Sequence, residues 1–334
     1  MRHFLNTFDW SRPELQAMVD EARRFKGSPF GKALEGKTIA LLFFNNSLRT
    51  RTSFDIGANQ LGGHAVVLAP SGGMWPLEFE EGAVMLDGAE EHVKEAAKVL
   101  SLYCDLIGIR AFPKFETWEE DRKDKILNAF AAYSDVPVIN LETITHPCQE
   151  LAHIMALQER LGRLDGKRYV LTWSYHPKPL NTAVANSAIL AAAKFGMDVT
   201  LLCPTEDFIL DHRYINIATR DAGANGRSLT ITHDIETAYE GADIVYAKSW
   251  GAIPFFGRWD EEKPIRDKYQ HFIVDSQKMA MTNDAVVSHC LPMRRNVIMT
   301  DEVFDGPRCI AYDEAENRLH VQKAIMARLV EEPG

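Results

Sequence analysis

The chain of 334 residues is poor in the features that mark secreted, membrane or nucleic-acid-binding proteins. It has five cysteines and no C-x-x-C pair, which is typical of reduced thiols and argues against a disulfide framework. No apolar run approaches the ~20 residues that cross a bilayer, and residues 1–10 lack the apolar core of a signal peptide. We therefore expect a cytoplasmic protein without a membrane partner.

Positive charge is also scarce. The 37 Lys and Arg residues are outnumbered by 47 Asp and Glu residues, so the formal net charge is −10. This balance argues against a broad basic surface for nucleic acid. The 46% of hydrophobic and 25% of charged residues are typical of a globular chain, and the length suggests two domains.

Short apolar runs alternate with segments of helical spacing in both halves of the chain. A capping box at Ser11 and Glu14 starts the first helix. The expected strands are 38–44, 64–68, 106–109 and 136–139, then 169–173, 199–203, 229–232, 243–247 and 272–274. The expected helices between them are 50–61, 91–103, 118–133, 148–161 and 182–195. This pattern predicts an α/β protein with two doubly wound parallel-sheet domains linked by long helices.

One segment matches a nucleotide motif. Residues 31–38, Gly-Lys-Ala-Leu-Glu-Gly-Lys-Thr, fit the P-loop formula G-x-x-x-x-G-K-T. A P-loop needs a strand before it and a helix after it, so that the helix N-terminus faces the phosphates. Here the helix comes first and the strand follows, which favours a surface turn. A P-loop nucleotide hydrolase stays an alternative of a different class.

The segment 45–54, Asn-Asn-Ser-Leu-Arg-Thr-Arg-Thr-Ser-Phe, follows the first expected strand and opens a helix. A helix N-terminus attracts anions through its N–H groups and its dipole. Arg49 and Arg51 oppose that dipole unless a dianion such as phosphate neutralises them. With the hydroxyls of Ser47 and Thr50 beside them, they predict an anion site. A capped helix with two solvated arginines is the alternative.

Three motifs resemble those of the aspartate/ornithine carbamoyltransferase family. Residues 47–54 resemble the carbamoyl-phosphate motif S-x-R-T-R, residues 146–149 resemble H-P-x-Q, and residues 289–292 resemble H-C-L-P. They occur in the family's order over nearly the whole chain. The resemblance implies the carbamoyltransferase fold, with residues 1–147 plus 310–334 binding carbamoyl phosphate and residues 148–309 binding an amino acid.

The H-C-L-P motif is of the ornithine type, but two features depart from ordinary ornithine enzymes. Residues 243–251 replace their D-x-x-x-S-M-G loop, and Glu142 stands where they usually have asparagine. Together with residues 74–76, Met-Trp-Pro, these features resemble the branch that uses N-acetylornithine. The resemblance implies carbamoyl transfer from carbamoyl phosphate to the side-chain amine of N-acetyl-L-ornithine, giving N-acetyl-L-citrulline and phosphate in arginine biosynthesis. N-succinylornithine and ornithine stay alternative substrates.

The resemblance also assigns the carbamoyl-phosphate site. Arg110 and His146 are the catalytic donors to the carbonyl oxygen, and Gln149 binds the carbamoyl nitrogen. Cys290 and Leu291 offer main-chain carbonyls to the same NH2 group. The complete set implied is Ser47, Leu48, Arg49, Thr50, Trp75, Arg110, His146, Gln149, Cys290, Leu291 and Arg318. Taken alone, His146 would be a core or turn residue, Cys290 a buried thiol and Arg318 a surface ion-pair partner.

The second substrate has lost its α-ammonium charge through acylation, so it needs partners for a carboxylate and a side-chain amine. Lys248 is the expected partner of the carboxylate and Glu142 of the amine, with Leu291 beside them. Glu90 is the expected specificity residue, because its carboxylate would repel a succinyl group. An ordinary acidic residue in a first helical turn is the alternative. Some acetylornithine enzymes have a carboxylated lysine where Ile298 stands.

We expect no metal and no other cofactor. His146 and His153 lie seven residues apart, without cysteine or carboxylate ligands at zinc spacing. In the family the loop that carries Trp75 reaches the neighbouring subunit, which implies a homotrimer with shared active sites and no nucleic-acid or membrane partner. An inactive regulatory subunit on the same fold is a further alternative, which the intact site residues oppose.

Overall fold

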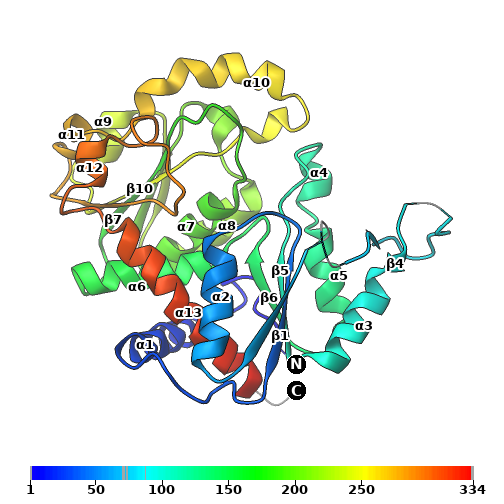
Figure 1. The fold of residues 1–334 in the computed structure, drawn as a ribbon. Helices are drawn as coiled ribbons and strands as arrows, with labels where there is room; N and C mark the ends of the chain where they lie inside the picture. Colours follow the sequence, from blue (N-terminus) through cyan, green and yellow to red (C-terminus); the bar gives the residue numbers. More distant parts are fainter. Residues whose placement is uncertain (1, 70–71, 73, 87, 332–334) are drawn as a thin grey trace. The chain divides into compact units, whose positions relative to one another are not determined.

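The computed structural model describes residues 2–69, 72, 74–86 and 88–331, which form two compact units (Figure 1). The first unit comprises Met1–Pro113, Asp121–Cys148 and Asn317–Gly334, and the second comprises Lys114–Glu120 and Gln149–Glu316. Residues 114–120 and 310–316 thus lie in the second unit.

The first unit contains a four-stranded parallel sheet. β1 (Thr38–Phe43) pairs with β2 (His64–Leu68) on one side and with β5 (Leu106–Arg110) on the other, and β6 (Val138–Glu142) completes the order β2-β1-β5-β6. The strand order reverses between β1 and β5. In open α/β sheets, ligands bind beyond the carboxyl ends of the strands at such a point.

Helices of the first unit cover this sheet. α1 (Arg12–Gly27) begins at the predicted capping box, where the Ser11 and Glu14 side chains bond reciprocally to each other's backbone. α2 (Arg49–Gln60) follows β1, while α3 (Val93–Tyr103) and α5 (Lys125–Tyr133) pack side by side (Figure 1). The core beneath α3 and α5 includes Ala40, Leu42, Val93, Ala97, Ile107, Ile109, Leu127, Phe130 and Val138.

Two predicted helices are wrong in their extent. The segment 118–133 forms α4 (Trp118–Asp121) and α5 instead of one helix. Asp124 breaks it, because its φ of 47° is left-handed, and its carboxylate accepts a hydrogen bond from Thr143 Oγ1 at 2.6 Å. The segment 91–103 becomes helical two residues late, since β4 (Glu91–His92) pairs with β3 (Leu77–Glu78).

The second unit contains a five-stranded parallel sheet in the order β11-β10-β7-β8-β9. Its strands are β7 (Arg168–Trp173), β8 (Asp198–Leu202), β9 (Leu229–Thr232), β10 (Ile244–Lys248) and β11 (Val286–Ser288). The strand order reverses between β7 and β10, which predicts a second binding region beyond their carboxyl ends. Every residue of α7 (Ala183–Lys194) is buried, and the helix packs against α8 (His212–Ala224).

The predicted strand 272–274 is wrong. Its first residue ends the 3-10 helix η3 (Asp267–Phe272), and Val274 makes only an isolated bridge to Met299. The fifth strand is β11, whose three residues are too few for an alternation pattern. Short helices of this unit are η1 (Glu206–Phe208), α9 (Ile235–Tyr239), η2 (Ile253–Phe255), α10 (Trp259–Arg266), α11 (Ser276–Met279) and α12 (Asp301–Phe304).

Two long helices run through both units. α6 (Pro147–Leu161) passes from Cys148 to Gln149 at the boundary, and α13 (Ala311–Glu331) passes from Glu316 to Asn317. The predicted class, two parallel-sheet α/β domains linked by long helices, is confirmed. Within the described ranges, no helix is long and apolar enough to cross a membrane.

The P-loop-like residues 31–38 form a turn that leads into β1, as their order along the chain predicts. Gly36 has a φ of 73°, and the Nζ atom of Lys37 lies 2.8 Å from Asp105 Oδ1. Because β1 and not a helix follows this turn, the segment presents no helix N-terminus to a phosphate.

Candidate active site

The N-terminus of α2 lies directly beyond the carboxyl end of β1. Ser47 Oγ accepts a hydrogen bond from the Thr50 N–H at 3.1 Å, and the first turn carries no acidic residue. The positive end of the helix dipole is therefore not offset by a local carboxylate. Arg49 is half-buried here, whereas Arg51 is exposed, because residues two apart on a helix point to different sides.

Two buried arginines meet the hydroxyl of Thr50. Arg110 donates to Thr50 Oγ1 at 3.4 Å and Arg318 donates to the same atom at 2.5 Å. Arg110 ends β5, in register with Phe43 of β1, so the strand pairing brings it to the start of α2. The Nε atoms of Arg110 and Arg318 are buried and have no hydrogen-bond partner among the described residues. Such unused donors suit an oxyanion with several acceptor sites.

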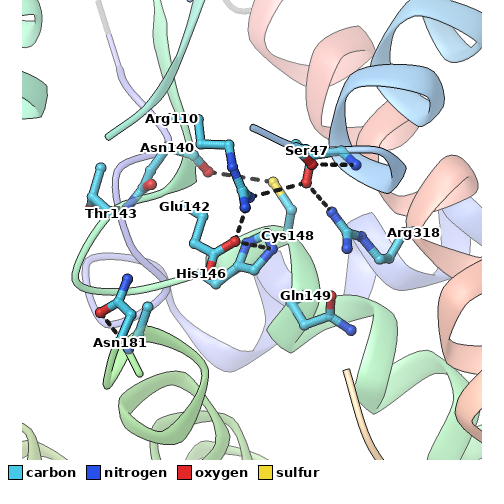
Figure 2. A network of polar contacts seen from close by, with 12 residues as sticks. Ser47, Arg110, Asn140, Glu142, Thr143, His146, Cys148, Gln149, Asn181 and Arg318 are labelled. Atoms are coloured by element: carbon cyan, nitrogen blue, oxygen red, sulfur yellow. Dashed lines mark hydrogen bonds and ion pairs between the residues drawn. The ribbon is translucent and has the colours of Figure 1, made fainter. Parts of the chain in front are cut away.

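Glu142 supplies a nearby negative charge. Its Oε2 atom forms an ion pair with Arg110 and lies 3.5 Å from His146 Nε2, and Figure 2 shows the three side chains pointing toward one another. Burial lowers the pKa of His146 well below its usual range, and Arg318, Arg110 and Arg49 lower it further. His146 is therefore a neutral imidazole at neutral pH, which can donate one N–H without adding charge.

The turn that carries His146 is fixed by a residue that the sequence analysis missed. Asn140, buried in β6, donates through Nδ2 to Leu5 O at 2.9 Å and to the hydroxyls of Thr143 and Thr145, each at 3.1 Å. The main-chain carbonyl oxygen of Asn140 accepts a hydrogen bond from Cys148 Sγ at 3.6 Å (Figure 2). A polar side chain between the apolar residues of a short buried run was the signal that could have identified Asn140.

In the second unit, Gln149 and the H-C-L-P turn occupy different elements. Gln149 is buried on α6 and donates through Nε2 to Glu314, whose side chain is fully buried. The turn follows β11, where the Leu291 N–H donates to His289 Nδ1 at 2.9 Å and Leu291 has a φ of 54°. A positive φ at leucine is a strained conformation, which is typical of functional turns.

Positive groups gather beyond the carboxyl ends of β7 and β10. Lys248, the last residue of β10, is buried and donates to Ser249 O at 2.7 Å. Arg294 Nε donates to His176 Nε2 at 2.9 Å. Burial lowers the pKa of His176, a hydrogen bond with Lys178 opposes this, and the charges of Arg294 and Lys248 add to the lowering. The sequence analysis named Lys248 but missed His176 and Arg294, which follow a strand end and the H-C-L-P motif.

Trp75 and Glu90 are both exposed, Trp75 by 66%. Ser71 and Gly73 of the glycine-rich loop before Trp75 lie outside the described residues. Ile298 is buried, and its carbonyl accepts from the Val274 N–H at 2.9 Å. In the part of the chain that the structure describes, no group of three or more His, Cys, Asp or Glu side chains could hold a metal ion.

Comparison with known proteins identifies the class. The family model described as aspartate/ornithine carbamoyltransferase, carbamoyl-P binding domain, matches residues 2–159, and the model of the Asp/Orn binding domain matches residues 179–329. The chain belongs to the aspartate/ornithine carbamoyltransferase family, as its three motifs predict.

Within this family, the chain is more similar to some enzymes than to others. The chain is 65% identical to the N-acetylornithine carbamoyltransferase of Xanthomonas campestris pv. campestris, over 99% of this chain and 98% of that protein. It is 38% identical to the N-succinylornithine carbamoyltransferase of Bacteroides thetaiotaomicron, over 95% and 93% of the two chains. The crystal structure of an acetylornithine transcarbamylase complexed with acetylcitrulline superposes with a TM-score of 0.98 at 65% identity, over 99% of this chain and all of that one.

Proposed function

We propose that the chain transfers the carbamoyl group of carbamoyl phosphate to the side-chain amine of N-acetyl-L-ornithine, giving N-acetyl-L-citrulline and phosphate. The observation that carries this is the pair of buried arginines on the Thr50 hydroxyl, at the N-terminus of α2 and the reversal point of the sheet. Full-length relatives at 65% identity act on N-acetylornithine by name, whereas the N-succinylornithine relative is at 38%.

The first unit binds the phosphate in this proposal. Residues 47–50 at the start of α2 contact the phosphate, largely through main-chain N–H groups other than that of Thr50, which bonds Ser47 Oγ. Arg49, Arg110 and Arg318 neutralise the dianion. Arg110 and the neutral His146 donate to the carbamoyl oxygen as negative charge develops on it. Removing water around these groups strengthens each of those contacts.

The second unit holds the rest of the reactants. Gln149 accepts from the carbamoyl NH2 group, together with the main-chain carbonyls of Cys290 and Leu291. Lys248 pairs with the carboxylate of the amino acid, and Arg294 with His176 lies in the same positive region. The domain of residues 1–147 plus 310–334 is thus proposed for carbamoyl phosphate and residues 148–309 for the amino acid.

The reaction needs no nucleophile from the protein. The amine, whose ordinary pKa is near ~10, loses a proton and its nitrogen attacks the carbamoyl carbon. The first proton goes to solvent. In the tetrahedral intermediate the attacking nitrogen carries a positive charge; the bond from carbon to the phosphate oxygen then breaks, and the departing phosphate takes up the second proton, which this nitrogen loses. Glu142 orients the amine through its carboxylate, so the protein acts by orientation and charge stabilisation.

Specificity and assembly form the finer part of the proposal. Exposed Trp75 and Glu90 suit a loop that completes the site of a neighbouring subunit in a homotrimer. There the Glu90 carboxylate would repel the extra carboxylate of a succinyl group. We also propose a role in cytoplasmic arginine biosynthesis, where the five cysteines, all free in the structure, would stay reduced.

A citrulline colour assay with N-acetylornithine, N-succinylornithine and ornithine tests the proposal. We expect N-acetylornithine to be turned over fastest, and faster turnover of free ornithine would contradict the substrate assignment. Calorimetry of the Arg49→Ala variant should give no measurable carbamoyl-phosphate binding. Wild-type affinity in that variant would overturn the anion site.

A further inference from the structure

The carboxylate of Glu314, near the start of α13, is fully buried in the second unit. Its Oε1 atom accepts hydrogen bonds from Gln149 Nε2 and, at 2.8 Å, from Tyr246 OH. Its Oε2 atom accepts from Ser288 OH at 2.5 Å and from His153 Nδ1 at 2.9 Å. All four donors are themselves buried, and they come from α6, β10 and β11.

This carboxylate is ionised and therefore only accepts. Burial raises the pKa of Glu314, but the charge of His153 and the hydrogen bonds from His153, Ser288 and Tyr246 outweigh burial and lower it below the ordinary value. The acceptor capacity of both oxygens is used by the four donors. Glu314 therefore has no spare capacity for a ligand, and its effect on chemistry must pass through its neighbours.

The ionised carboxylate of Glu314 decides which end of the Gln149 side-chain amide faces it. A glutamine side chain has a donating NH2 end and an accepting oxygen, and the two are nearly equal in shape. Because Glu314 cannot donate, the NH2 end must face it. The Oε1 end then points elsewhere, and this atom is buried without a hydrogen-bond partner among the described residues. Gln149 thus presents an unused acceptor that is suited to an N–H donor.

We propose that Glu314 is a positioning residue that fixes the amide of Gln149 with its oxygen toward the substrate, and so selects a carbamoyl group over an acyl group without N–H. The inference rests on the proposed function, in which Gln149 binds the carbamoyl nitrogen. His153 lies one turn after Gln149 on the same face of α6 and also bonds Glu314. It completes the carboxylate's coordination, and its other nitrogen bonds Tyr169 OH at 3.1 Å.

Two stable phosphonates test the orientation. Phosphonoacetamide carries an NH2 group where 2-oxopropylphosphonate carries CH3, and the two share the same phosphonate dianion and carbonyl. Calorimetry of the full chain should give tighter binding of the amide by about tenfold, the value of roughly one hydrogen bond. In the Glu314→Gln variant this preference should fall to within about twofold, while the Kd of the ketone is unchanged.

Controls separate orientation from folding. The Ser288→Ala variant removes a different donor to Glu314, and we expect it to keep the preference. The double variant Gln149→Glu with Glu314→Gln exchanges the two groups; its carboxylate at position 149 has no N–H end to misplace, so the preference should return. A preference retained in Glu314→Gln, or absent from a folded exchange variant, overturns the proposal.

Failure of the proposed carbamoyl-transfer function gives different results from failure of the Glu314 proposal. If the wild-type chain binds neither phosphonate and transfers no carbamoyl group, the proposed function fails. If it binds both with equal Kd, Gln149 does not bind the carbamoyl nitrogen. Both results are read in the wild-type chain before any Glu314 variant is considered.

Discussion

The polar centres of the two units are built in opposite ways. Around the Thr50 hydroxyl, Arg110 and Arg318 lie close together with buried Nε donors that no described residue uses. Around Glu314, four neutral or histidine donors use both carboxylate oxygens. The first centre thus keeps donors for the anion that we propose it binds, whereas the second uses its acceptors internally, as the proposed positioning role requires.

The largest expected effect is on the incomplete centre. The Arg318→Met variant should lose about 10³-fold in kcat/KM, since truncating a buried charged donor costs roughly 2–5 kcal/mol of binding. Without ligand its melting temperature should not fall, because one of several clustered positive charges is gone. Steady-state kinetics measure the change in kcat/KM, and thermal denaturation measures the melting temperature. The exposed Arg51→Ala variant is the control, and a fall of similar size there would break the comparison.

His146 should come next in size. The His146→Ala variant removes a donor to the carbamoyl oxygen, and loss of one such donor lowers kcat by roughly 10²-fold or more. Assays of carbamoyl transfer at saturating concentrations of both substrates measure kcat of the variant and of the wild type. An unchanged kcat with a raised KM would mean that the imidazole binds the ground state and the transition state equally.

The pH dependence of the folding stability tests whether His146 is a neutral, buried imidazole. The pKa of His146 is lowered in the folded chain, mainly by burial, so the unfolded chain binds a proton more readily between the folded pKa and about 6.5. Stability should therefore fall as pH drops below about 6.5 and be level above it. The Tm difference between pH 7.5 and pH 5 should shrink by a few degrees in His146→Ala. An unchanged difference would contradict a neutral buried imidazole.

A smaller effect is expected in the positive region of the second unit. The Lys248→Met variant should raise KM for the amino acid by about tenfold or somewhat more, the loss of one charge-assisted hydrogen bond. Carbamoyl-phosphate affinity should stay within about twofold, because we propose that Lys248 binds the other substrate. Equal loss of both affinities would show that the two units do not divide the substrates as proposed.

The smallest effect is expected at Lys37. Its ion pair with Asp105 is partly exposed, with 43% and 33% of the two side chains accessible, so Lys37→Ala should cost less than about 1 kcal/mol of stability. Neither this variant nor the wild type should gain thermal stability from ATP. Stabilisation by ATP that Lys37→Ala removes would restore the P-loop interpretation.

Much of the fold was accessible from sequence because its signals are local. The capping box at Ser11 and the alternation of short apolar runs with helical segments gave α1 and most strands close to their observed bounds. The errors fall where local signals are weak or overridden. β11 has three residues, and the break at Asp124 depends on a left-handed backbone supported by Thr143 from a later turn.

The sequence by itself determined the α/β class and the family and predicted an anion site at the start of α2, since each depends on neighbouring residues or short motifs. Only the tertiary structure decided which distant groups meet. Arg318 reaches a hydroxyl 268 positions earlier in the chain, and Glu314 reaches an amide 165 positions earlier. Such pairings arise from strand order and from the path of α13, which no periodicity within a short window encodes. The direction of the Gln149 amide follows from its buried neighbour and therefore belongs to the fold.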